Sequence, residues 1–382
     1  MSHRSRFLVY PLTAIAVVLA AGLPVSASAP EPTPEPAPQA VASSLPSSVT
    51  PPWVRLCRKL KQQRRHRHIR CHNPRGRDHR VPLRVAAART PTLSELTIPT
   101  SPATPVGIVT GPDGNVWFTE AYGNKIGRVT TGGLFTEFSL PNEESMPTGL
   151  AVGPDGALWF TESIGNRIGR ITTSGTITEY TIPTAASYPW GITAGPDGAL
   201  WFTESDGNKI GRITTSGTFT EYALPTSTVY PMEITTGPDG ALWFAQALGG
   251  GITRVTTSGV FTEYNSPTTG SMPIGITSGP DGNLWYTDGN GAVGKVTTSG
   301  VFTEYPLSNA NAFPWGITVG PDDDLWFVEQ VTGKVATVST SGIITEYALP
   351  DAFSGPFHIT TGPDDKIWFT EDYIDKLGIL TL

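Results

Sequence analysis

Residues 189–225 read "PWGITAGPDGALWFTESDGNKIGRITTSGTFTEYALP", and this unit contains the pattern from which the fold can be predicted. It divides into four strand-like pieces, "GITAG", "LWFTE", "NKIGRIT" and "TFTEYAL". "PDG" and "TSG" separate them, and such triplets suit tight turns because Pro fixes φ and Gly accepts positive φ. Trp201 and Phe202 are neighbours in the second piece, so they face opposite sides of a sheet. One small sheet cannot bury both faces, and the unit therefore predicts a stack of similar sheets.

The unit recurs along residues 92–382 with a nearly constant period. A proline opens each repeat, at Pro105, Pro147, Pro189, Pro231, Pro273, Pro314 and Pro356, with spacings of 42 residues and once 41. A period near 40 with four strands per unit is typical of a β-propeller. The last unit ends at its third strand, "KLGILTL", whereas "TLSELTIP" at residues 92–99 matches the fourth-strand text "IITEYALP". We therefore predict an all-β, seven-bladed propeller whose last blade is closed by the N-terminal strand.

The residues before the propeller have the composition of an exported protein. "MSHRSR", an apolar run and "VSASA" predict a signal peptide over residues 1–27. The apolar run could instead be a membrane anchor, but Pro11, Pro24 and the small-residue exit favour cleavage, which leaves no transmembrane span. Residues 28–53 are predicted to be a Pro-rich linker and residues 54–91 a basic, disordered segment. We expect a secreted or cell-envelope protein.

Charge is divided unevenly along the chain. Residues 1–90 carry a net charge of +12, and residues 91–382 carry −19. The basic segment could bind nucleic acid, an anionic wall polymer, a membrane surface or its own acidic propeller, and export argues against nucleic acid. Cys57 and Cys71 are the only cysteines and could form a disulfide. We expect a monomer.

Two blades break the repeat at one informative position. The residue two after the opening proline is glycine in five blades, but Glu233 in blade four and His358 in blade seven. These two blades lie nearly opposite each other in a seven-membered ring. His358 is the only histidine after His79, so it is the strongest candidate for a catalytic base. Because a repeat that breaks its own rule is informative, we favour a functional role for the pair over simple packing.

One position earlier, the seven blades supply an apolar and aromatic ring. Its members are Val106, Thr148, Trp190, Met232, Ile274, Trp315 and Phe357. This ring could be the rim of a site for a flat or apolar ligand, with Trp190, Met232, Trp315 and Phe357 beside Glu233. It could equally close the mouth of the central channel.

Acidic residues also recur, and we interpret them as structural. Five blades have a glutamate at the end of the second strand and a base five residues later, which predicts an ion pair across the hairpin rather than a cation site. The aspartate of each "GPDG" is interpreted as a turn former rather than a calcium ligand.

The repeat text "GPDGALWFTESIGNRIGRITTSGTITEYTIP", residues 153–183, resembles that of the virginiamycin B lyase family, and the likeness covers residues 92–382. The resemblance implies a seven-bladed propeller. It also implies a magnesium-dependent elimination that opens the ester bond of streptogramin B-type cyclic depsipeptides without adding water. Such chemistry needs a base for an α-proton and a metal for the developing enolate.

The same resemblance implies where the reacting groups belong. The family's histidine after the blade-six proline corresponds to Trp315, its Glu-Pro-His step to Gly355, Pro356 and Phe357, and its metal-binding glutamate to Asp372. His358 stands one residue too late, and on a regular strand that shift turns a side chain to the other face. A bulge could restore its direction, but nothing in the sequence requires one.

Because three of these four positions are replaced, we predict a binding or interaction module for a small molecule, peptide or cell-surface polymer. The alternative is a magnesium-dependent lyase with His358 as base, and with Asp372, Glu371 and Glu233 as metal ligands or orienting carboxylates. A purely structural scaffold is a third possibility.

Overall fold

The computed structural model describes residues 91–382. The predicted signal peptide, linker and basic segment, with Cys57 and Cys71, lie outside these residues apart from Pro91. All regular elements in the described part of the chain are β-strands. Residues 91–382 include no helix of the length and apolar character needed to cross a bilayer.

The strands follow the repeat. In chain order they are β1 (Thr92–Thr97), β2 (Pro105–Thr110), β3 (Val116–Glu120), β4 (Lys125–Val129), β5 (Phe135–Ser139), β6 (Pro147–Val152), β7 (Leu158–Glu162), β8 (Arg167–Ile171), β9 (Ile177–Thr181), β10 (Pro189–Ala194), β11 (Leu200–Glu204), β12 (Lys209–Ile213), β13 (Phe219–Ala223), β14 (Pro231–Thr236), β15 (Leu242–Gln246), β16 (Gly251–Val255), β17 (Phe261–Asn265), β18 (Pro273–Ser278), β19 (Leu284–Asp288), β20 (Ala292–Val296), β21 (Phe302–Pro306), β22 (Pro314–Val319), β23 (Leu325–Glu329), β24 (Lys334–Val338), β25 (Ile344–Ala348), β26 (Pro356–Thr361), β27 (Ile367–Glu371) and β28 (Lys376–Thr381).

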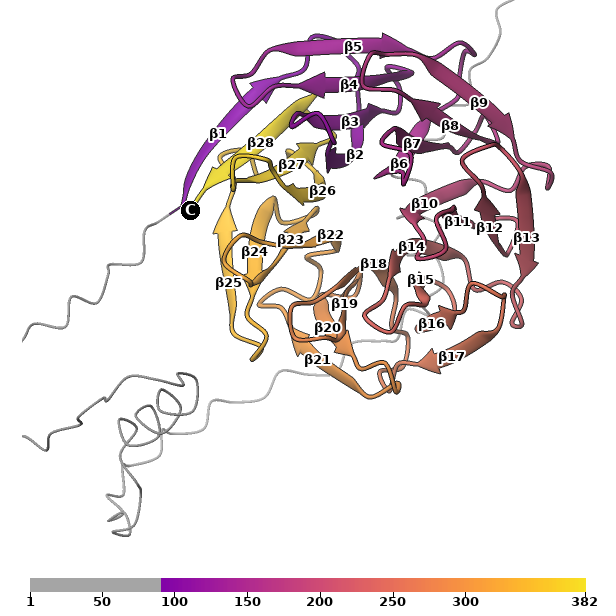
Figure 1. The fold of residues 1–382 in the computed structure, drawn as a ribbon. Helices are drawn as coiled ribbons and strands as arrows, with labels where there is room; N and C mark the ends of the chain where they lie inside the picture. Colours follow the sequence, from indigo (N-terminus) through magenta and orange to yellow (C-terminus); the bar gives the residue numbers. More distant parts are fainter. Residues whose placement is uncertain (1–90) are drawn as a thin grey trace, which may run out of the picture. The chain divides into compact units, whose positions relative to one another are not determined.

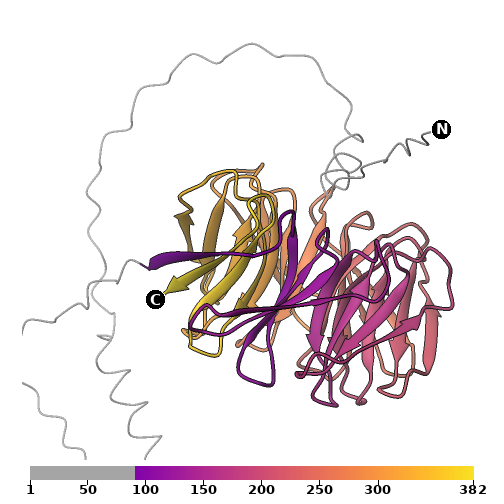
Figure 2. The ribbon, with the colours of Figure 1, turned by 90° about the horizontal axis from the view of Figure 1, so that it is seen from above.

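These strands form seven four-stranded antiparallel sheets arranged around one axis, with β2, β6, β10, β14, β18, β22 and β26 innermost (Figure 1). The seventh sheet has the order β26-β27-β28-β1. β1 runs antiparallel to β28 with Glu95 opposite Gly378, and the two strands lie side by side near the C-terminus (Figure 2). The predicted seven-bladed propeller, closed by its N-terminal strand, is therefore confirmed.

The core lies between neighbouring blades. Trp159 of blade two packs against Ile192 and Phe202 of blade three, and Phe202 and Trp159 are fully buried. The tryptophan of each second strand is followed by phenylalanine, or by Tyr286 in blade five, so one ring points to the following blade and one to the preceding blade. Burying a phenylalanine side chain stabilises a fold by about 1.5–3 kcal/mol. Each sheet is therefore held mainly by its two neighbours.

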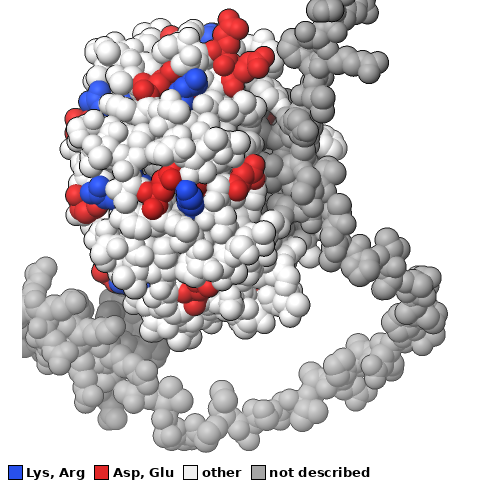
Figure 3. All heavy atoms as spheres, turned by 90° about the vertical axis from the view of Figure 1, so that its right-hand side faces the viewer, with Lys and Arg blue, Asp and Glu red and all other residues white. Residues whose placement is uncertain are grey.

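The turn aspartates support this core. Trp201 Nε1 donates a hydrogen bond to Asp197 at 3.0 Å, and Arg212 Nε lies 2.7 Å from the same carboxylate. The other "PDG"-type turns repeat the tryptophan contact, which satisfies a buried N–H group. On the side of the ring seen in Figure 3, basic and acidic side chains lie beside each other, separated by uncharged surface. These aspartates act as hydrogen-bond acceptors within the fold.

Candidate functional site

The candidate site lies on the face where each inner strand begins. The loop between second and third strands lies on the same face, because its backbone bonds to the segment before the inner strand: Ala121 N donates to Thr104 O at 3.0 Å, and Ser163 N donates to Met146 O at 3.0 Å. We call this the loop face. The "PDG" and "TSG" turns lie at the opposite ends of the strands.

Every inner strand carries a bulge directly after its opening proline. In blade seven, Pro356 pairs with Glu371 and Ile359 pairs with Phe369, so Phe357 and His358 together oppose a single residue of β27. The same irregularity occurs in the other six blades. A bulge of this kind re-aims side chains that a regular strand would alternate.

The bulge turns both of its residues toward the propeller axis. Phe357 lies 6.3 Å from the Trp190 ring across the axis, and His358 Nε2 lies 3.3 Å from Glu233 Oε1. The expectation for a regular strand, that His358 points to the opposite face from Phe357, is therefore wrong, and the alternative of a bulge is the one that the structure has. Strand alternation does not hold at a bulge, and no residue type in the repeat text requires one.

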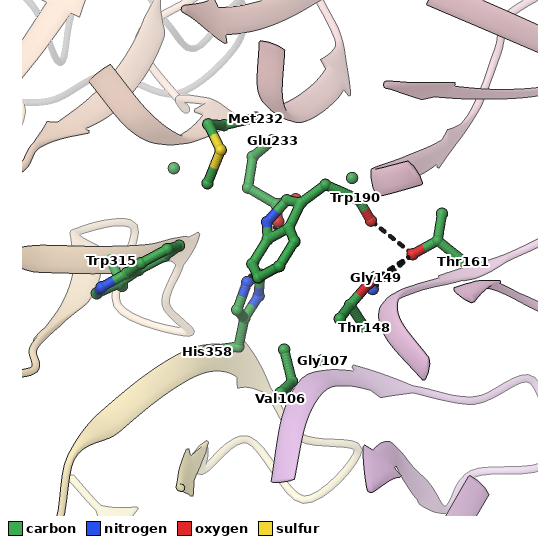
Figure 4. A network of polar contacts seen from close by, with 12 residues as sticks. Val106, Gly107, Thr148, Gly149, Thr161, Trp190, Met232, Glu233, Trp315 and His358 are labelled. Atoms are coloured by element: carbon green, nitrogen blue, oxygen red, sulfur yellow. Dashed lines mark hydrogen bonds and ion pairs between the residues drawn. The ribbon is translucent and has the colours of Figure 1, made fainter. Parts of the chain in front are cut away.

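The predicted rim forms a buried layer across the axis. The Trp315 and Phe357 rings stack at 4.2 Å between centroids, and Trp190 lies 6.0 Å from Trp315. Trp190, Met232 and Phe357 are each 1% exposed, and Trp315 is 4% exposed. We call this set the aromatic layer, and Figure 4 labels three of its members, Trp190, Met232 and Trp315. It underlies the loop face, and its contact with a ligand stays a prediction.

The structure brings the two exceptional residues together. Glu233 comes from β14 and His358 from β26, and Figure 4 shows their side chains pointing toward one another near the axis. Each side chain is 15% exposed, so water reaches both. Although Nε2 and Oε1 are 3.3 Å apart, Glu233 Oε1 is buried and has no hydrogen bond of normal geometry. His358 as a catalytic residue stays a prediction.

Glycine fills this position in the other blades for a steric reason. A Cβ built on Gly149 would lie 2.2 Å from the Trp190 carbonyl oxygen of the next blade. Thr161 Oγ1 joins the same groups, accepting from Gly149 N at 2.9 Å and donating to Trp190 O at 2.6 Å (Figure 4). Neighbouring backbones therefore approach closely at each bulge, and a side chain here forces a local adjustment.

The positions implied by the family resemblance hold few reactive groups. Gly355 has φ +63°, and a Cβ built on it would lie 2.2 Å from Asp372 Oδ1. Asp372 is 3% exposed, its carboxylate oxygens lack hydrogen-bond partners of normal geometry, and burial raises its pKa to about 8. Trp315 Nε1 donates to Gln330 Oε1 at 3.0 Å. Asp372 thus occupies the space next to Gly355, where the resemblance implies a glutamate side chain. At Trp315, where it implies a histidine, the side chain is an indole.

Glu371 belongs to a set of fully buried glutamates at the ends of second strands. Burial raises the pKa of Glu120 to about 8 and of Glu162, Glu204 and Glu371 to about 7. The predicted hairpin ion pair is found only at Arg167–Glu162, 3.5 Å, and Lys334–Glu329, 3.9 Å.

In most blades the base pairs elsewhere, so the hairpin prediction is wrong for them. Lys209 Nζ lies 2.9 Å from Glu221 of the fourth strand, and Lys125 Nζ lies 2.8 Å from Glu137. The fourth-strand carboxylates are partly exposed. A lysine ammonium group can pair with them while it stays partly hydrated, which avoids the desolvation cost of pairing with a buried glutamate. The second-strand glutamates are left without a close counter-ion in these blades.

A magnesium ion does not fit the residues at the family positions. Gly355, Trp315 and Phe357 offer no oxygen or imidazole ligand, and Asp372 stands alone among them. Within residues 91–382, no three His, Cys, Asp or Glu side chains converge on a point where they could hold a metal ion. A metal-binding role for Asp372 with Glu371 stays a prediction.

The loop face also carries residues that the sequence analysis missed. Tyr188, Tyr230 and Phe313 precede the opening prolines, have φ between 51° and 53°, and are partly exposed. Large exposed apolar side chains also occur in the loops of this face: Tyr122, Ile164, Leu248, Val331, Phe353 and Tyr373. A depression of about 210 Å³ lies between blades three and four, lined by Ser205, Asp206, Asn208, Thr228, Tyr230 and Leu248. An alignment of the seven repeats that included the loops could have found these residues, because three repeats have an aromatic residue directly before the opening proline.

Comparisons with known proteins agree with this fold. The model of the virginiamycin B lyase family matches residues 77–228 and 192–382. The selenomethionine-substituted virginiamycin B lyase from Staphylococcus aureus is 42% identical, with a TM-score of 0.74, covering 77% of this chain and 100% of that chain. A structure described as a streptogramin B lyase is 38% identical, with a TM-score of 0.74, covering 76% and 98%.

A third solved structure is a catalytically inactive histidine-to-alanine variant of the Staphylococcus aureus virginiamycin B lyase with quinupristin. It is 42% identical, with a TM-score of 0.74, and covers 77% of this chain and 100% of that chain. No match was found among curated proteins.

Proposed function

The chain belongs to the virginiamycin B lyase family, and we propose that it is an exported binding protein that holds an apolar cyclic peptide of the streptogramin B type on its loop face without opening it. The ligand rests on the loop-face side chains above the aromatic layer.

The stack of Trp315 on Phe357 carries the proposal. These are the two positions at which the family resemblance implies histidines, and their rings lie 4.2 Å apart. Neither an indole nor a phenyl ring can take an α-proton, so neither can serve as the base for elimination. Gly355 provides no carboxylate where the resemblance implies a glutamate. The proposed protein therefore lacks the groups for elimination but keeps the propeller fold and the loop face.

The loop face has the composition of a site for an apolar ligand. Leu248 is 56% exposed, Tyr373 is 51% exposed and Phe353 is 82% exposed, so these loops offer apolar side chains to a ligand. Tyr188 and Tyr230 add rings that offer apolar surface with a polar tip. A relative that lost catalysis through one histidine was solved with quinupristin, so loss of catalysis and retention of this ligand are compatible in the family.

A magnesium-dependent lyase that uses His358 is the second candidate. One observation favours it: the bulge directs His358 to the axis, beside Glu233 at 3.3 Å. A carboxylate at that distance could orient the imidazole as a base. This candidate requires turnover that depends on His358, whereas the binding protein requires none.

Isothermal titration of the full chain with quinupristin tests the binding function. We expect saturable binding at one site, with an affinity that is unchanged when EDTA removes divalent ions. Absence of a saturable heat signal up to the solubility limit of quinupristin, in protein with a cooperative melting transition, would contradict it.

A further inference from the structure

Blade three departs from the repeat at one position of the loop face. In five blades the second residue after the second strand is large, apolar and exposed: Tyr122, Ile164, Leu248, Val331 and Tyr373. Blade five has Asn290 at this position, and blade three has Asp206, the only charged side chain among the seven. A repeat that breaks its own rule is informative, so Asp206 is a candidate for a specific role.

Two tyrosines that are also exceptional in the repeat lie beside Asp206. Among the residues directly before the seven opening prolines, only Tyr188 and Tyr230 are tyrosines. Ser205 N donates to Tyr188 O at 3.1 Å, so Tyr188 adjoins the loop that carries Asp206. Tyr230 and Asp206 both line the depression of about 210 Å³ between blades three and four. A carboxylate and two phenol rings therefore gather at one place on the loop face.

Most polar side chains that line the depression are already engaged within the fold. The hydroxyl groups of Ser205 and Thr228 each donate to a backbone carbonyl at 2.6 Å, and Asn208 Nδ2 donates to another at 3.0 Å. The Asp206 carboxylate and the Tyr230 hydroxyl form no hydrogen bond with any residue of 91–382. These two groups are left to interact with a ligand.

No lysine or arginine of residues 91–382 forms an ion pair with Asp206. The nearest base along the chain is Lys209, and its Nζ lies 2.9 Å from Glu221. Blade four, on the other side of the depression, has Gly251 at the position that Lys209 occupies in blade three. Partial burial raises the pKa of Asp206, because its carboxylate has lost part of its hydration. A cation in the depression would compensate this loss.

The two tyrosine rings lie within electrostatic range of this carboxylate. Burial, and to a smaller extent the charge of Asp206, raises the pKa of Tyr188 to about 12 and also raises that of Tyr230. Tyr188 stacks on Trp190 with centroids 6.2 Å apart and planes 15° apart, which holds its ring in place. The face of a tyrosine ring attracts cations, and organic ammonium groups bind beside such rings in other proteins.

The lining suits an organic ammonium group and does not suit a bare metal ion. Asp206 is the only charged residue of the depression, and within residues 91–382 no three His, Cys, Asp or Glu side chains converge to hold a metal. Leu248 and the Tyr230 ring offer carbon surface to the alkyl or aryl groups that an amine carries. Pockets for whole drug-sized ligands measure about 300–1,000 Å³. The smaller depression therefore accepts one functional group of a larger molecule.

We propose that Asp206 and Tyr230 bind the ammonium group of a positively charged organic ligand, with Leu248 in contact with the carbon atoms next to the nitrogen. The carboxylate supplies charge attraction, and the tyrosine supplies the face of its ring. The site goes beyond the proposed function, because it selects for a charged group and accepts any ligand that carries this group, whether or not the ligand is a cyclic peptide.

Two small probes that differ in one group test the site. Phenethylammonium and phenylethanol share a ring and an ethyl chain, and only the first is charged at pH 7. Saturation-transfer NMR titrations with the full-length wild-type chain give a dissociation constant for each probe. We expect the ammonium probe to bind about fivefold or more tightly than the alcohol. High salt should reduce this preference, because it screens the charge of an exposed carboxylate.

Two variants with the same change in net charge show whether Asp206 is responsible. Asp206→Asn removes the charge and keeps the size of the side chain. Glu143→Gln, at an exposed carboxylate in a loop of the same face, is the control. We expect Asp206→Asn to bind the two probes equally and Glu143→Gln to keep the wild-type preference. Both variants should melt at the wild-type temperature, since both side chains are exposed.

Three results would overturn the proposal: equal binding of both probes by the wild-type chain, a preference that persists in Asp206→Asn, or an equal loss of preference in the two variants. The wild-type comparison needs no substitution, so it stands even if a variant fails to fold. Quinupristin is absent from these samples. A failure of the ammonium site is therefore distinguishable from a failure of the proposed binding function.

Discussion

The Trp315 indole stacks on the Phe357 ring with centroids 4.2 Å apart and planes 28° apart. These residues come from β22 and β26, the inner strands of adjacent blades. Both rings reach the axis because each follows the opening proline, at the first position of a bulge. Two positions at which the family resemblance implies histidines therefore form a packing contact in this chain.

Trp315→Ala should destabilise the propeller strongly. The side chain is 4% exposed, contacts Trp190 and Phe357, and donates a hydrogen bond to Gln330. Removing a buried tryptophan costs about 3–5 kcal/mol of stability. Chemical denaturation followed by fluorescence measures the loss. Phe353→Ala, at a side chain 82% exposed, is the control and should change stability by no more than about 0.5 kcal/mol. Equal effects would show that the layer is not packed as described.

Gly149→Ala tests the close approach of blades at the bulge. The added Cβ would lie 2.2 Å from the Trp190 carbonyl oxygen, so we expect a loss of about 1–3 kcal/mol. Gly132→Ala is the matched control, because Gly132 has no positive φ and its nearest neighbour would lie 3.7 Å from the new Cβ. A melting temperature lowered in Gly149→Ala and unchanged in Gly132→Ala supports the account. Tolerance of both substitutions would argue against the bulge geometry.

Glu204→Gln should flatten the pH dependence of stability. Burial raises the pKa of Glu204 to about 7 from an ordinary value of 4.5. Between these values the folded chain holds a proton that the unfolded chain has released, so stability falls as pH rises from about 4.5 to about 7 and stays reduced above it. Glutamine cannot ionise, so the variant should gain about 1–3 kcal/mol relative to wild type on going from pH 5 to pH 8.

Melting temperatures across that pH range provide the comparison. Glu143→Gln, at an exposed carboxylate, should follow the wild-type curve. If the Glu204→Gln curve also runs parallel to wild type, the buried carboxyl is not the titrating group.

Leu248→Ala should weaken quinupristin binding without lowering the melting temperature. The side chain is 56% exposed and lines the depression between blades three and four. Loss of its contact with an apolar ligand should reduce affinity by about tenfold. Leu134→Ala is the control, since Leu134 is 71% exposed in a turn at the other end of the strands. Equal affinities of the two variants would place the ligand elsewhere.

The repeat text was sufficient to predict the fold. Each strand is short, each turn contains Pro, Asp or Gly at a defined place, and Trp201 and Phe202 show which residues face neighbouring blades. Residues 92–99 resemble a fourth strand without a repeat of their own, and the last repeat lacks its fourth strand. Because an open sheet edge is unfavourable, these two observations predicted that β1 completes the last blade. Periodic patterns of this kind depend on local geometry, and local geometry is what a sequence encodes most directly.

The site could be predicted only in part. The repeat exceptions Glu233 and His358 were recognised, and their position across the ring followed from the blade count. The direction expected for His358 on a regular strand was wrong, because a bulge depends on how the inner strand pairs with β27 and not on residue types. The ion-pair partner of Lys209 was also predicted wrongly. Glu204 and Glu221 both lie near Lys209, and the lysine pairs with Glu221 because Glu204 is fully buried and Glu221 is partly exposed.

Whether the chain opens quinupristin or only binds it can be measured directly. The full chain is incubated with quinupristin and magnesium, and chromatography with tandem mass spectrometry separates the cyclic compound from its isomeric linear product. The Staphylococcus aureus virginiamycin B lyase serves as the positive control. We predict no linear product above the protein-free sample, with or without magnesium, from protein that binds quinupristin by calorimetry. Linear product that accumulates with time, and disappears in His358→Ala, would contradict the binding-only account and establish a lyase.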